Sequence, residues 1–439
     1  MRPLRLGCGA GYAGDRIGPA AALARHGRLD VLVFECLAER TVALAQLARQ
    51  RDPQAGFDRL LEPRLRAVLP ECAAQGITII SNMGAANPRG AAEKARQVAR
   101  DLGLRGLKIA IVEGDDIFDR RPPDLHPEDA DVSPDRVLSA NAYLGAAPIL
   151  QALQLGADIV LTGRVADPSL FVAPVLHHFG WAADDWHRLG QATLAGHMLE
   201  CAAQVTGGYF ADPGRKEVPG LDDPGFPIGV IAADGGLEIT KLAQSGGSIT
   251  LAGCKEQMLY EVFDPAAYLT PDVTADFSRV RMTRPGPDRV RLEGATGRPA
   301  PERLKVSMGY RAGFLGEASI SYCGSTAGAR ARLATGILAR RLARETRALE
   351  LRCDTLGDNA LSLGCGHPGP EPLEASARAA GLYATEAEAL QVGDEVEALY
   401  VNGPFGGGGV RRSVEEVIAI TSAYVPRDSV TPRVEMLET

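Results

Sequence analysis

The sequence predicts an α/β fold, with a parallel, doubly wound sheet in the N-terminal part and a smaller α+β domain at the C-terminal end. Short apolar runs, each suited to one buried strand, lie at 4–8, 30–35, 77–80, 107–112 and 157–161. Segments with helical patterning separate them, at 17–26, 39–51, 58–75, 88–102 and 139–155. Strands that alternate with helices indicate βαβ units, and therefore a parallel sheet.

The chain also suggests a division into domains. Residues 1–280 are expected to form the α/β domain, with the doubly wound part ending near residue 210 and further strands at 227–232 and 248–253. Residues 281–302 are rich in Pro, Gly and Arg, which predicts a linker. Within 303–439, strands are expected at 303–309, 316–323, 349–353, 394–401 and 411–424, and a long amphipathic helix at 325–347.

The composition excludes several classes of protein. A net charge of −8 argues against nucleic-acid binding, which needs a basic face. No run approaches the roughly 18 apolar residues of a membrane span, and the N-terminus does not read as a signal peptide. The eight cysteines are scattered without zinc-site spacing. These features predict a cytoplasmic protein with reduced thiols.

The stretch Leu161–Asp167 is the centre of the functional prediction. Thr162, Arg164 and Asp167 are expected in the loop between an apolar strand and a helix that Pro168 opens. In parallel sheets such loops lie at the carboxyl ends of the strands, where ligands bind. Arg164 would bind a carboxylate or phosphate and Asp167 would move a proton. The alternative is an Arg–Asp pair that only pins the loop.

A glycine-rich segment follows the first strand. Gly9, Gly11 and Gly14 fit GxGxxG, and Glu35 or Glu39 could serve as the acidic residue after the second strand. The following helix, however, begins too late for a dinucleotide fingerprint. We therefore expect a tight turn, with Gly9, Gly11 and Asp15 lining an anionic ligand.

Polar residues also follow the third and fourth strands. Asn82 is expected to contact ligand, whereas Asn87 before Pro88 is expected to cap a helix. Glu113 and Asp115 belong to a carboxylate cluster that could bind Mg²⁺ or act as acid and base. The competing interpretation of this cluster is a solvated acidic turn.

Three later segments complete the candidate site. Asn141 and Tyr143 stand at the start of the helix predicted at 139–155 and are expected to face the ligand. His197 lies three residues before Glu200, so it is a candidate acid/base on one helical face. Asn402, Gly406 and Gly407 belong to a glycine run that forms either an anion nest or a flexible hairpin.

These segments together resemble the acyclic terpene utilisation AtuA-like family. The resemblance rests on the blocks 139–145, 162–167, 196–197, 204–208 and 402–409 and runs from about residue 5 to the end. It implies a role in degrading acyclic terpenoids through CoA thioesters, but no catalytic residues transfer with it. Phe405 and Met83 stand where relatives often carry smaller residues, which would reshape a pocket.

The sequence therefore predicts a catabolic enzyme of the hydratase or lyase type. Its substrate would be a small carboxylate or an acyl-CoA thioester, with Asp167, His197 or Glu113 moving the proton. A non-catalytic ligand-binding or complex-forming protein is the alternative, and an NAD(P)-dependent oxidoreductase the third. We expect a homo-oligomer with a small-molecule ligand. No cofactor is assigned, and a divalent metal is left open.

Overall fold

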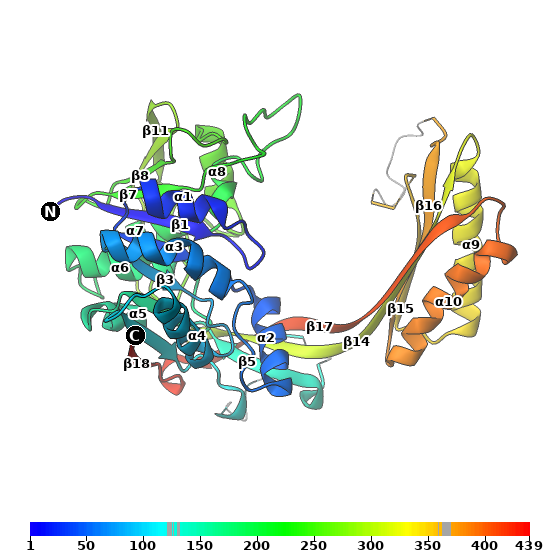
Figure 1. Cartoon of the computed structure of the whole chain (residues 1–439), viewed down its shortest axis with the longest axis horizontal. Coiled ribbons are helices and arrows are strands. Elements are labelled where there is room, and N and C mark those ends of the chain that lie inside the picture. The colour runs from blue at the N-terminus through cyan, green and yellow to red at the C-terminus, as the bar shows by residue number, and fades with distance from the viewer. Residues whose placement is uncertain (121–124, 126, 130–131, 359, 362–369) are drawn as a thin grey trace. The chain divides into compact units, whose positions relative to one another are not determined.

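The computed structural model describes residues 1–120, 125, 127–129, 132–358, 360–361 and 370–439 (Figure 1). The chain forms two compact units. The larger comprises 1–132, 137–309 and 420–439, and the smaller 133–136 and 310–419. The predicted boundaries at 281 and 303 therefore differ from those of the compact units. Among the described helices, none is long and apolar enough to cross a membrane.

The larger unit alternates strands and helices through residue 199. Its strands there are β1 (Leu4–Ala10), β2 (Val31–Phe34), β3 (Thr78–Ser81), β4 (Lys108–Glu113), β5 (Val137–Ala142) and β6 (Ile159–Thr162). Its helices there are α1 (Gly18–His26), α2 (Glu39–Arg51), α3 (Leu61–Gln75), α4 (Pro88–Asp101), α5 (Ala147–Gln154), α6 (Ser169–Phe179) and α7 (Trp186–Leu199). The predicted cap is confirmed, since the Asn87 side chain accepts a hydrogen bond from the Gly90 amide at the start of α4.

The remainder of this unit is richer in strands. It contains α8 (Leu251–Leu259) and the strands β7 (Ile228–Ile231), β8 (Leu237–Thr240), β9 (Tyr268–Leu269), β10 (Thr274–Asp276), β11 (Arg281–Gly286), β12 (Arg289–Glu293), β13 (Thr296–Arg298) and β18 (Arg433–Glu438). The main sheet has the order β11-β12-β8-β7-β1-β2-β3-β6-β4-β18. Strands β1, β2, β3, β6 and β4 pair in parallel, while β7 and β18 join antiparallel. The predicted α/β class is confirmed, but the sheet is mixed.

Three predicted elements of this unit are wrong. The segment expected to form one helix, 139–155, forms β5 followed by α5. Every residue of 137–142 is buried, so this stretch lacks the alternation of buried and exposed residues by which a strand and a helix can be told apart. The strand expected at 248–253 is replaced by the start of α8, which Thr250 caps by accepting a hydrogen bond from the Gly253 amide. The expected linker 281–302 forms β11, β12 and β13, because β12 pairs with both β8 and β11; no Pro or Gly lies within β12 itself.

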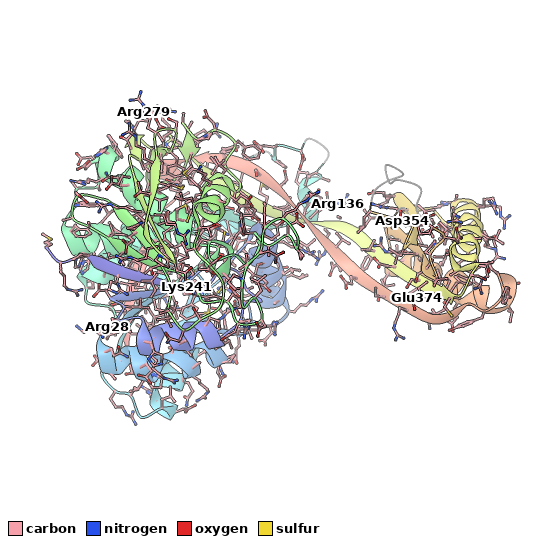
Figure 2. The ribbon with its side chains drawn as sticks, turned by 90° about the horizontal axis from the view of Figure 1, so that it is seen from above. Arg28, Arg136, Lys241, Arg279, Asp354 and Glu374 are labelled. Carbon is pink, nitrogen blue, oxygen red and sulfur yellow. The ribbon has the colours of Figure 1, made fainter. Side chains whose placement is uncertain are left out.

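The smaller unit is an α+β sandwich. Two long strands, β14 (Arg303–Cys323) and β17 (Gly408–Pro426), have residues in both units, and between them lie α9 (Ala327–Glu345), β15 (Glu350–Leu356), β16 (Glu374–Tyr383) and α10 (Glu386–Asn402). The sheet order β15-β16-β14-β17 is that of a βαββαβ, ferredoxin-like arrangement. Small and apolar side chains of the helices and strands form its core. Figure 2 marks Asp354 and Glu374 on its strands.

Two predictions in this unit also fail. Residues 394–401 lie in α10, because Thr385 caps the helix through the Glu388 amide, while Val392, Val396 and Leu399 are buried at helical spacing. No turn interrupts 303–323, which is one continuous strand. The described cysteines are free, and Cys365 lies outside the described residues.

Candidate active site

The loops after the parallel strands meet at one edge of the sheet, as the carboxyl ends of parallel strands must. Arg164, in the loop after β6, lies at the centre of this edge. Its side chain is 1% exposed, and its backbone amide donates to Asp115 Oδ2, in the loop after β4, at 2.8 Å. Its guanidinium reaches the loop after β2, where it donates to the Leu37 carbonyl oxygen.

The guanidinium of Arg164 also holds Asp167, the partly exposed residue of this loop. It donates to Asp167 Oδ1, and its Nε donates to the Val165 carbonyl oxygen at 2.9 Å. The charged plane lies 4.3 Å from the ring centre of Tyr143. A buried Arg with these partners holds the loop rigidly. The Arg164–Asp167 pair, considered as the alternative interpretation of this loop, therefore exists. The predicted binding of a ligand carboxylate or phosphate by Arg164 gains no support, because its buried guanidinium donates to protein partners and does not line the cavity beside Asp167.

Asp167, unlike its partner Arg164, is partly accessible to solvent. Its side chain keeps 38% of its surface exposed. The surrounding protein still removes enough water to raise the pKa of this carboxyl well above its usual range, against the opposing charge of Arg164. Glu35 and Glu200 add to the rise because their charges repel a second carboxylate. Burial and the neighbouring carboxylates therefore both favour the protonated form of this group.

Two glutamates after β2, Glu35 and Glu39, have pKa values that are shifted in opposite directions. Burial raises the pKa of Glu35, whose Oε1 accepts hydrogen bonds from Asn82 Nδ2 and the Leu37 amide, each at 2.9 Å. Burial also opposes ionisation of Glu39, but the hydrogen bond from Tyr143 and the charge of Arg164 outweigh it and lower its pKa to about 2. Glu39 is therefore a fixed carboxylate, and Asn82 is a support for Glu35.

A cavity of about 290 Å³ opens beside these groups. Glu39, Tyr143 and Asp167 line one part of it, together with Lys305 of β14. Lys305 Nζ lies 3.2 Å from Glu39 Oε1 and 5.0 Å from the ring centre of Tyr143. The remaining lining residues include Tyr268, Leu269, Pro271, Pro301, Arg303 and Tyr424. The cavity is therefore lined by the ionised carboxylate of Glu39, by Asp167 and Lys305, and by apolar side chains.

His197 lies behind this cavity and does not line it. The ring is 1% exposed and stacks on Phe277, with centres 5.8 Å apart. Its Nδ1 is 2.9 Å from Glu200 Oε1 and its Nε2 is 3.2 Å from the Met258 carbonyl oxygen. Both ring nitrogens therefore have partners, so direct proton transfer to a ligand in the cavity is not supported. Tyr268 contacts the ring and connects it to the cavity.

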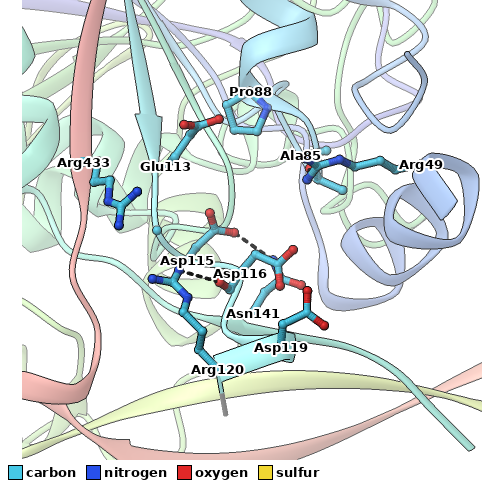
Figure 3. A pocket seen from close by; sticks show the side chains of 12 residues that line it. Arg49, Ala85, Pro88, Glu113, Asp115, Asp116, Asp119, Arg120, Asn141 and Arg433 are labelled. Carbon is cyan, nitrogen blue, oxygen red and sulfur yellow. Dashed lines mark hydrogen bonds between the residues drawn. The ribbon is translucent and has the colours of Figure 1, made fainter. Parts of the chain in front are cut away.

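Glu113 and Asp115 line a different cavity of about 250 Å³ (Figure 3). Glu113 is also 3.4 Å from Arg89. Asn141 donates to Asp115 Oδ2 at 2.8 Å, and burial raises the pKa of Asp115 to about 6. The prediction joined Glu113, Asn141 and Asp115 to Asp167 in one pocket, whereas the structure assigns them to a neighbouring cavity. Asp115 connects the two through the Arg164 amide.

Thr162 and the glycine-rich turn after β1 are structural in their contacts. The Thr162 hydroxyl is buried and donates to the Gly163 carbonyl oxygen at 2.9 Å. Asp15 accepts a hydrogen bond from the Gly11 amide at 2.9 Å, which occupies a donor expected to face an anion. A side chain at Gly9 would meet the Phe34 ring at 2.7 Å. These glycines therefore permit close packing.

The predicted residues Asn402, Gly406 and Gly407 belong to the smaller unit. Asn402 ends α10 and donates to the Ala398 carbonyl oxygen at 3.2 Å. Gly406 has φ +72°, a conformation that favours glycine. A side chain at Gly407 would meet Ile320 at 2.9 Å. Local backbone geometry and packing account for the glycine run within this unit.

The sequence did not single out the cavity residues that come from distant segments. Glu39 was considered only as part of a nucleotide fingerprint, and Lys305 was not considered as a site residue. Arg303 and Tyr268 carried no motif. The alternation of Arg303 and Lys305 along β14 was the available signal, and it does not reveal which cavity the strand borders. Within the described residues, no group of three or more His, Cys, Asp or Glu side chains is arranged to hold a metal ion.

Comparison with known proteins gives one match. A family model described as acyclic terpene utilisation family protein AtuA matches residues 4–436. No curated protein and no solved structure matches the chain.

Proposed function

The chain belongs to the acyclic terpene utilisation family AtuA, and we propose that it is a catabolic enzyme of the hydratase or lyase type. Its substrate would be a carboxylic acid or acyl thioester derived from an acyclic terpene. The family description supports the metabolic role. The observation that carries the reaction class is the part-exposed Asp167 carboxyl, which borders the cavity, contacts Arg164 and has a raised pKa.

A single carboxyl can carry out the proposed elimination of water. Asp167 as carboxylate takes the proton from the carbon next to the substrate carbonyl, and the C–H electrons form the double bond. The C–O bond to the neighbouring hydroxyl breaks, and Asp167 returns its proton to the departing oxygen as water forms. Hydration is the reverse. A base is most effective when its pKa is near the working pH, which the raised pKa of Asp167 favours.

The neighbouring groups would hold this carboxyl and the substrate in place. Arg164 orients Asp167 through its guanidinium. Tyr143 and Lys305 both contact Glu39, which fixes their polar atoms at the cavity wall. The remaining N–H groups of Lys305 are candidates to stabilise negative charge that develops on a substrate carbonyl oxygen, whereas the single O–H of Tyr143 is donated to Glu39.

Mass spectrometry tests the proposal. The full chain would be incubated with β-hydroxy and α,β-unsaturated acyclic terpenoid acids and with their CoA thioesters, and gain or loss of water measured. Asp167→Asn should lower turnover by on the order of 10² or more, the usual contribution of a positioned acid or base. Asp222→Asn removes an exposed carboxylate outside the cavity and serves as the matched control.

Two outcomes would count against the proposal. Near-normal turnover by Asp167→Asn would remove Asp167 from the chemistry. Tight binding of these compounds by the wild-type chain with no turnover of any of them would instead favour a ligand-binding or complex-forming role.

A further inference from the structure

Three cations lie at or behind the wall of the cavity beside Asp167, and two of them contact carboxylates. Lys305 lies 3.2 Å from Glu39, and the guanidinium of Arg164 contacts Asp167, so each of these cations has a carboxylate partner. Arg303, two residues before Lys305 on β14, also lines the cavity. Alternate residues of a strand point to the same face, which brings the two β14 cations together.

Arg303 has no carboxylate partner among the described residues. Its Nη2 donates to the backbone carbonyl oxygen of Tyr424, another lining residue. This bond anchors the guanidinium at the cavity and leaves most of its five N–H donors available. An anchored guanidinium with free donors suits a planar carboxylate, which it can bind through two parallel hydrogen bonds.

Part of the cavity lining is apolar. Tyr268, Leu269 and Pro271 form a wall from one segment, and Pro301 adds a further apolar surface. Leu269 is 66% exposed. A hydrocarbon chain laid against this wall would remove that surface from water, which is favourable.

From this arrangement we infer that the cavity binds a free monocarboxylate with an apolar chain, its carboxylate at Arg303 and its chain along Tyr268, Leu269 and Pro271. This inference rests on the proposed function and specifies its substrate. One unpaired cation matches one negative charge. The volume of about 290 Å³ lies near the lower limit for small-molecule sites, roughly 300 Å³, so it suits an acid better than a whole CoA thioester.

Isothermal titration calorimetry with three probes tests the inference. Geranate supplies the carboxylate and an apolar chain, geraniol the same chain without charge, and geranoyl-CoA the chain as its thioester. The full-length protein should bind geranate at least tenfold more tightly than either of the others. Arg303→Gln should lose that preference for geranate over geraniol. Leu269→Asp should weaken both geranate and geraniol.

Arg298→Gln is the matched control, because Arg298 also donates to a backbone carbonyl oxygen, that of Ala266, but does not line the cavity. It should bind as the wild type does. Equal binding of geranate and geraniol by the wild type, tighter binding of geranoyl-CoA, or no binding of any probe would overturn the inference. So would an Arg303→Gln variant that keeps the preference.

The failure of this inference and that of the proposed reaction give different results. Preferential binding of geranate without turnover of any tested acid refutes the reaction and leaves the ligand class intact. Turnover that requires Asp167 but favours the thioester refutes the ligand class and leaves the reaction intact.

Discussion

Replacing Asp115 with Asn should make the stability of the larger unit less sensitive to pH. Asp115 is buried, and burial raises its pKa from 3.8 to about 6, against hydrogen bonds from the Arg164 amide and Asn141. A folded-state pKa above the unfolded value gives stabilisation that is fully present below pH 3.8 and is lost as the pH rises through about 6. The difference of about 2.2 in pKa corresponds to about 3 kcal/mol, at 1.36 kcal/mol for each tenfold change in proton affinity.

The Asn variant keeps an acceptor for both hydrogen bonds and cannot ionise. Its unfolding free energy, minus that of the wild type, should therefore increase by about 2 kcal/mol between pH 4 and pH 7, because part of the full change has already taken place at pH 4. Urea unfolding at several pH values, followed by tryptophan fluorescence of Trp181 and Trp186 in the larger unit, measures this difference. Asp222→Asn controls for the loss of one exposed charge. A difference that stays flat, or that falls as the pH rises, would refute the reasoning.

Three further substitutions test the packing around the site and the core of the smaller unit. Gly163→Ala would place a Cβ 2.4 Å from Asp115 Oδ1 and should destabilise the larger unit by about 1–3 kcal/mol in urea; an unchanged midpoint would contradict the tight fit. His197→Phe leaves the Glu200 carboxylate without its partner and should lower the unfolding free energy by about 3 kcal/mol, part of which Glu200→Gln should restore; equal single and double variants would argue against the pair. Leu338→Ala, at a fully buried position of α9, should cost about 2–5 kcal/mol, seen as faster amide hydrogen exchange in the smaller unit, and unchanged exchange would place this side chain outside the core.

The sequence predicted the parallel strands and the edge where their loops meet, because apolar runs and helical spacing are local signals. The Arg164–Asp167 pair, which the sequence offered as the alternative to a ligand-binding role, exists. Tyr143, expected to face a ligand, lines a cavity. The sequence did not show that Glu113, Asp115 and Asn141 line a different cavity from Asp167. All of these residues follow strands or lie near their ends, and a sequence pattern places them at the same edge of the sheet without distinguishing cavities there. The Arg164 amide and Asn141 hold Asp115 on the other side of the loop.

Tertiary contacts decided the elements that the sequence mispredicted. β5 is a strand because it pairs with β14, more than 160 residues away, as the hydrogen bond between the Tyr143 amide and the Lys305 carbonyl oxygen shows. The Asp-Glu-Val-Glu alternation at 394–397 suggested a strand, while the capping residue that identifies α10, Thr385, lies well before it. The role of His197 depended on Met258, a partner that no local pattern reveals.

The protonation of Asp167 tests the central claim most directly. Carbon-13 NMR of the full chain labelled at aspartate carboxyl carbons, with the Asp167 signal identified by its absence in Asp167→Asn, would follow this group across pH. The account predicts a midpoint well above the ordinary 3.8. A midpoint at or below 3.8 would contradict it, because burial and the neighbouring carboxylates would then not favour the protonated form of Asp167.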